Sequence, residues 1–202
     1  HATIGEVRTN AVHVSVDQLG SDREHLLVHG TATAAAEKAW PIMLQSPLAL
    51  NSAFLSRMSW DYAPVSLDLQ IDAALYPEAE GILVRGKTLF THNQLKFTWP
   101  QAALTMTDLT GTLYFNEKGL LPSQLQGLLF NHNMPVTVAV SALPQHTTFL
   151  KGHTEVEIDK LFESLHIATP KALSGAAHVH AILRLPSGEG AVNQLKIKTD
   201  LA

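Results

Sequence analysis

The chain has 202 residues, of which 46% are hydrophobic and only 16% charged, with no cysteine and a formal net charge of -4 at neutral pH. Without a basic stripe it is not expected to bind nucleic acid, and without cysteine it cannot form disulfides, thiolate zinc sites or a cysteine nucleophile. The low charged fraction suits a protein rich in sheet and apolar surface. Because the sequence opens and closes in strand-like segments and starts without a signal-peptide core, we expect a segment of a longer chain rather than a mature secreted protein.

The first third of the chain predicts alternating strands with one short helix between them. Ala11–Asp17 alternates valine with polar residues, and Leu26–Ala34 follows as a second strand. Ser46 precedes a proline, a pattern typical of a helix start, and predicts an amphipathic helix that reaches Met58. Val65–Ala73 is the clearest strand, with its apolar residues on one face and serine, aspartate and glutamine on the other.

The middle of the chain predicts a meander. Ile82–Phe90 and Leu95–Trp99 are expected to form a hairpin around the four polar residues between them. Leu104–Leu143 then predicts three or four strands in series, joined by turns at Asn116–Gly119 and Asn131–Pro135. Apolar residues alternate here with small or polar ones, which indicates a sheet with one apolar face.

The last third adds strands at Thr147–Ile158, Ala177–Leu185 and Val192–Leu201, with a short helix at Asp159–Ile167. No linker or low-complexity stretch divides the chain. The sequence therefore predicts a mainly β fold, in which an antiparallel meander forms a curved, groove-like sheet with two short α-helices. We expect residues 1–202 to be a single β-rich domain or a segment of a longer repeating β-groove protein.

Motifs for catalysis or cofactor binding are weak. His178 and His180 could place two imidazoles on one strand face, a spacing that metal sites use, but the alternative is an ordinary polar face. No nucleophile elbow or phosphate-binding glycine loop occurs, and the carboxylate pair Asp68 and Asp72 lies on the polar face of its strand. We predict no enzyme activity, no cofactor and no metal, and we keep a histidine-dependent metal binder as a testable alternative.

Two segments of the meander, TGTLYFNEKGL and LQGLLFNHNMPVTVAV, resemble the recurring unit of the AsmA-like envelope proteins, particularly the YhdP group. Gln45–Leu48, the strand VSLDLQI, Gly86-Lys87 and the ending NQLKIKTDLA are similar to segments of that group, so the resemblance covers most of the chain. Asn131–Asn133 departs from the pattern, because the family more often has a glycine before the proline.

The resemblance implies a TamB-related protein of Gram-negative bacteria that is anchored in the inner membrane. Its periplasmic part would be a groove-shaped β-sheet that carries phospholipid toward the outer membrane. The expected partners are phospholipid acyl chains and flanking segments of the same longer chain, with the membrane reached through parts outside this sequence. No catalytic residue or cofactor is implied.

One-sided alternation and the family pattern together identify the residues expected to line the groove. They are Val65, Leu67, Leu69, Ile71, Leu113, Phe115, Val136, Val138 and Val140. About ten strands at ~4.8 Å spacing give roughly 45 Å of groove, so this chain could supply one segment of a longer conduit. The alternative is a non-transporting scaffold or protein-interaction module of the cell envelope, with the same apolar face as an ordinary core.

Overall fold

A computed structural model of the chain describes residues 3–4, 7–21, 23–45, 56–76, 81–99, 102–129, 134–143, 147–160, 174–186 and 194–201. Thirteen strands within these ranges form one antiparallel sheet, which confirms the predicted mainly β fold. The strands are β1 (Thr3–Ile4), β2 (Val7–Asp17), β3 (His25–Ala35), β4 (Met58–Trp60), β5 (Pro64–Ala74), β6 (Ile82–Trp99), β7 (Ala102–Asn116), β8 (Gly119–Leu120), β9 (Ser123–Leu129), β10 (Met134–Leu143), β11 (Thr147–Glu157), β12 (Ala176–Pro186) and β13 (Gln194–Leu201).

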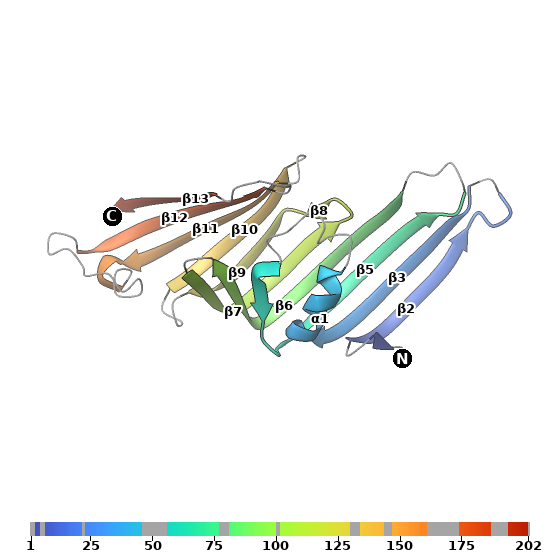
Figure 1. Cartoon of the computed structure of the whole chain (residues 1–202), viewed down its shortest axis with the longest axis horizontal. Helices are drawn as coiled ribbons and strands as arrows, with labels where there is room; N and C mark the ends of the chain where they lie inside the picture. Colours follow the sequence, from blue (N-terminus) through green and yellow to red (C-terminus); the bar gives the residue numbers. More distant parts are fainter. Residues whose placement is uncertain are drawn as a thin grey trace.

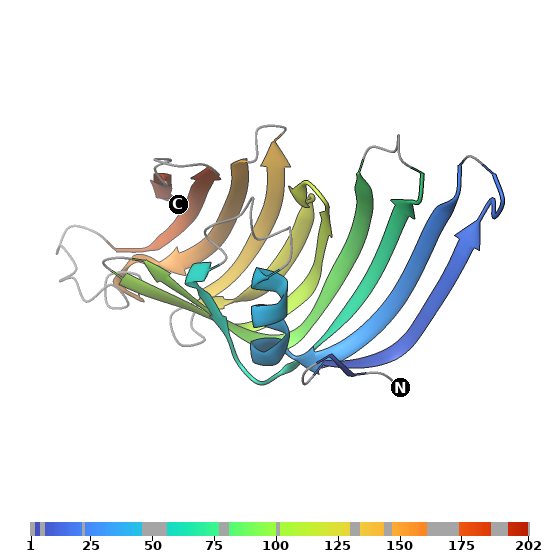
Figure 2. The same ribbon diagram turned by 45° about the vertical axis from the view of Figure 1, so that its right-hand side comes forward.

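The order of strands in the sheet follows their order in the chain. From β1 to β13 each strand pairs with the next, except that β4 pairs with β6 and β8 pairs with β7 as side branches (Figure 1). The sheet curls into an open trough with α1 (Ala36–Leu44) on its inner side (Figure 2). We call the side of the sheet that carries α1 the inner face and the opposite side the outer face.

Alternation in the sequence decides which side chains point to which face. In β5, Val65 is buried on the inner face while its neighbour Ser66 is exposed on the outer face, and the same period of two continues along the strand. The cross-strand register preserves the separation: Val65 lies opposite Phe90 of β6, and Leu69 lies opposite Gly86. The inner face is therefore largely apolar across the sheet, whereas the outer face carries the charged side chains together with a few exposed apolar ones, such as Leu83 and Leu89.

The predicted hairpin at Ile82–Trp99 is wrong. These residues form one strand, β6, of 18 residues, whose register against β7 shifts on both sides of Asn93. The four polar residues that suggested a turn form a β-bulge instead, in which His92 adopts a positive φ of 58°. Bulges and tight turns favour similar polar residues. Here the segments before and after Asn93 both pair with β7, so the polar residues form a bulge within one strand rather than a turn between two.

Two helices were predicted. The first one observed, α1, lies at Ala36–Leu44, ahead of the predicted helix. The predicted helix lies outside the described part of the chain up to Leu55, and its predicted end at Met58 is wrong, because Met58 begins strand β4. The start of α1 has no capping side chain, because alanine stands at the N-cap position, Ala35. The backbone N–H groups of Ala36 and Glu37 instead donate to the carbonyls of Ala63 and Asp61.

The second helix begins near its predicted place. Ile158–Lys160 is helical, and the rest of the predicted segment lies outside the described residues. Ile158 is buried, and its backbone N–H donates to the carbonyl of Gly175, just before β12. The meander prediction is confirmed by β7, β9 and β10, with a turn and the two-residue strand β8 between β7 and β9.

Candidate functional site

No described strand position on the inner face holds a charged residue. In β2, β3 and β5 the inner positions hold valine, leucine, isoleucine, alanine and glycine, together with one threonine, Thr9. In β6 to β13 the described inner side chains are also apolar, apart from Thr88, Asn93, Ser123, Thr154 and Thr199. Such a surface can accept apolar groups without desolvating an ionised side chain.

All nine residues predicted to line the groove belong to strands of this sheet. Four of them are buried, namely Val65, Leu113, Phe115 and Val136. Four are half-buried, namely Leu67, Leu69, Ile71 and Val138. The ninth, Val140, pairs through its backbone with Ser123 and Leu150, and its side chain lies outside the described part.

Aromatic side chains pack beneath α1 and cover one end of the inner face. Trp40 of α1 lies 5.2 Å from Trp60 of β4, measured between ring centroids. Trp60 in turn stacks on Phe90 of β6 at 4.8 Å, with the ring planes 7° apart. These rings join one hydrophobic cluster that includes Val65 and Leu109, so this end of the face is an ordinary packed core.

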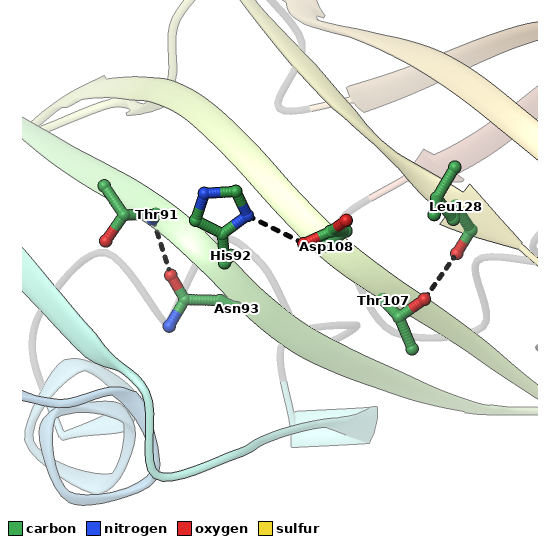
Figure 3. A network of polar contacts seen from close by, with 6 residues as sticks. All are labelled: Thr91, His92, Asn93, Thr107, Asp108 and Leu128. Carbon is green, nitrogen blue, oxygen red and sulfur yellow. Dashed lines mark hydrogen bonds and ion pairs between the residues drawn. The ribbon is translucent and has the colours of Figure 1, made fainter. Parts of the chain in front are cut away.

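A corner in the sheet supports this cluster. His92 in β6 and Asp108 in β7 both have positive φ, and the His92 Nδ1 and Asp108 Oδ1 atoms are 2.7 Å apart (Figure 3). Asn93 is fully buried; its Oδ1 accepts from the Thr91 N–H, and its Nδ2 donates to the Ala63 carbonyl at 3.1 Å. Asn93 thereby satisfies one backbone group at the bulge of β6 and one in the connection between β4 and β5. Sequence reasoning missed this role of Asn93, because the polar residues around it are also typical of a turn.

The ring of Phe115 lies across Gly86. A Cβ atom placed on Gly86 would come within 2.3 Å of the Phe115 ring, closer than any real side chain allows. Gly86 therefore leaves the space that the ring fills, and Leu120 of β8 is buried beside it in the same cluster. Sequence alternation predicted that Phe115 faces inward but could not show that it lies over the neighbouring strand.

The far ends of β2, β3, β5 and β6 remain uncovered by described residues. Val12, Val14 and Val16 of β2 are 53%, 57% and 40% exposed, and Ile82 of β6 is 57% exposed. These residues were not among the predicted groove residues, although the three valines show the same alternation as β5. Exposed large apolar side chains in a contiguous group are typical of a binding surface.

Cross-strand polar pairs lie on the outer face. The His25 Nδ1 is 2.7 Å from Asp72 Oδ1, and the His29 Nε2 is 2.9 Å from Asp68 Oδ1. The Lys87 Nζ is 3.3 Å from the second oxygen of Asp68. The hydrogen bond with His29, followed by that with Lys87, holds the pKa of Asp68 below its ordinary value. The polar face predicted for β5 is thus confirmed. Its aspartates contact side chains of β3 and β6 instead of being only solvated.

The two histidines considered for metal binding are exposed on β12. His178 lies opposite Glu155 and His180 opposite His153, whose ring centroid is 6.5 Å from that of His180. Across the described ranges, no three histidine, aspartate or glutamate side chains come together as a metal site. A hollow of about 540 Å³ nearby is lined by His92, Asp108 and Gln126 together with apolar residues such as Leu128 and Val136.

Comparison with known families now adds to this geometry. A family model described as YhdP protein matches residues 1–202. The chain belongs to the YhdP family. No curated protein and no solved structure gives a significant match. The YhdP family is a family of envelope proteins associated with lipid transport, and the open, one-sided sheet fits that association. Within the described ranges of this YhdP-family chain, no helix is both long and apolar enough to cross a bilayer.

Proposed function

We propose that this chain is a periplasmic segment of an inner-membrane-anchored conduit, whose inner face conducts phospholipid acyl chains between the inner and outer membranes. Membership of the YhdP family supports the envelope location and the link to lipid. The observation that carries the proposal is the inner face itself, which is uncharged at every described position from β2 to β13. No catalytic residue or cofactor is assigned.

The physical chemistry of acyl chains suits such a surface. Each methylene group removed from water contributes about 0.8 kcal/mol, so a few carbons on the inner face would bind measurably. Because no described strand position on the inner face holds a charged residue, an acyl chain that moves along it would meet no ionised side chain of the sheet. Ten strands from β2 to β13 at about 4.8 Å span roughly 43 Å, so flanking segments of the same protein would continue the path.

Lipid capture by charge variants on opposite faces tests the proposal. Ile71 faces inward and is half-buried outside the hydrophobic cluster, whereas its neighbour Gln70 is exposed on the outer face. We expect Ile71→Asp to lose most of the phospholipid that the wild-type domain carries in native mass spectrometry, with circular dichroism unchanged. Gln70→Asp places the same charge one residue away and should keep the lipid. A wild-type domain without lipid, even after incubation with phosphatidylethanolamine vesicles, would contradict the proposal.

A non-transporting envelope scaffold is the second candidate, and the packed cluster under α1 favours it. There the inner face already serves as a core, with Trp40, Phe90 and Leu109 buried. If the whole face were a core, Ile71→Asp would unfold the domain instead of leaving it folded and free of lipid. Thermal unfolding of the same two variants therefore separates the candidates.

A further inference from the structure

The inner face divides into two halves with different burial. The helix half, which lies toward α1 and β4, consists of buried residues: Val65, Phe90, Phe97, Met106, Leu109, Leu125 and Val136. The loop half, at the far ends of the first strands, consists of half-buried or exposed residues outside the hydrophobic cluster: Val12, Val14, Val16, Leu26, Val28, Ile71 and Ile82.

Strands β5 and β6 contribute to both halves with one unbroken face alternation as far as Phe90, so the difference in burial along these two strands comes from what covers them. Over the helix half lie Trp40 and Trp60, whose rings stack toward Phe90. The register places the loop half together on four adjacent strands: Val14 lies opposite Val28, and Val28 lies opposite Ile71. Four strands give this patch a width of about 14 Å.

The loop half also has a boundary along the sheet. Beyond β6, the Phe115 ring covers Gly86, and Leu120 of β8 is buried at the same level. The backbone of Glu117 donates to the carbonyl of Val84 at 3.2 Å, which holds the turn after β7 against β6. Packed side chains therefore limit the loop half on two sides, toward α1 and toward β7.

From this geometry we infer that acyl chains in this segment occupy the loop half alone, bounded by the α1 cluster on one side and by Phe115 on the other. This inference rests on the proposed function and adds where on the sheet the lipid lies. It also changes the expected contact residues: Val65, Leu113 and Val136 belong to the core, whereas Val14, Val28 and Ile71 touch the acyl chain.

Methyl NMR of the wild-type protein with stearate that carries a nitroxide at its methyl end tests the inference without any substitution. We expect the nitroxide to broaden the methyl signals of Val14, Val28 and Ile71 at least fivefold more than those of Val65 and Leu109. Leu83 and Leu89 serve as controls, because they are exposed but lie on the outer face. A water-soluble nitroxide should broaden those two, and the stearate should spare them.

The outcomes separate the inference from the proposed function. Equal broadening in both halves, or broadening confined to the helix half, would overturn the inference while leaving lipid binding in place. No broadening beyond the Leu83 and Leu89 level would overturn both. Phe115→Ala tests the boundary toward β7: removing the ring should extend the broadening to Leu120, which lies opposite Phe115, and an unchanged pattern in this variant would contradict that boundary.

Discussion

Strand β6 passes through both halves of the inner face, so the burial of its side chains can be compared between the helix half and the loop half within one element. In the middle of the strand Phe90 is 4% exposed beneath Trp60, and at its first residue Ile82 is 57% exposed, although both side chains point to the same side. Alternation in a sequence tells which face a residue occupies. Whether that face is covered depends on elements elsewhere in the chain, here α1 and β4.

The largest expected effect is a difference in the free energy of unfolding between variants in the helix half and in the loop half. Phe90→Ala should lower the free energy of unfolding by about 3–5 kcal/mol, because it opens a cavity in the packed cluster. Ile82→Ala, on the same strand and face, should cost less than about 1 kcal/mol, because its side chain is already largely in water. Urea unfolding followed by circular dichroism measures both. Similar losses in the two variants would show that the loop half is covered as well.

Phe115 is an exception within this comparison, since it is buried close to the uncovered patch. Gly86→Ala should destabilise the protein by about 1–3 kcal/mol, because the new Cβ displaces the Phe115 ring. In the Phe115→Ala background the same change should be close to neutral. Gly152→Ala is the matched control, since its Cβ would meet Val136 at an ordinary 3.5 Å. Additive losses in the double variant would mean that the ring and Gly86 are not coupled.

The smallest expected effect concerns the outer face. The pKa of Asp68 is lowered, so its contacts with His29 and Lys87 stabilise the folded protein at pH values above the ordinary aspartate range near 4 and lose that effect as the pH falls further. Asp68→Asn should therefore be less stable than wild type by about 0.2–1 kcal/mol at pH 7, with the gap closing toward pH 3. Thermal unfolding across this range measures the gap, and Gln70→Ala should show a difference from wild type that is independent of pH.

Most of the sheet could be predicted from the sequence because its signal is local. Val65–Ala73 and Ala177–Leu185 were each identified within one residue of the observed strand, since the period of two is visible in the strand itself. The nine predicted groove residues all fall in strands for the same reason. Their burial was not predictable, because it depends on contacts between residues far apart in the chain.

The elements that were missed depend on such distant contacts. The start of α1 is satisfied by carbonyls of Asp61 and Ala63, and Pro41 inside it further weakened any local helix signal. Asn93 appeared to belong to a turn because its partner carbonyl, on Ala63, is thirty residues away. Both misjudged segments meet at the corner of the sheet, where tertiary contacts override local preference.

The strands follow one another in the sheet nearly as they do in the chain, and this order determines how the insertion or deletion of strands would change the span of the sheet. Because each strand of the main path contacts mainly its immediate neighbours in sequence, the sheet behaves as a nearly one-dimensional array, with a stability that is roughly a sum over adjacent pairs. A hairpin inserted or deleted between two neighbours would alter the span by about 10 Å and leave distant strands unaffected. The distance that such a sheet bridges can thus be adjusted one hairpin at a time.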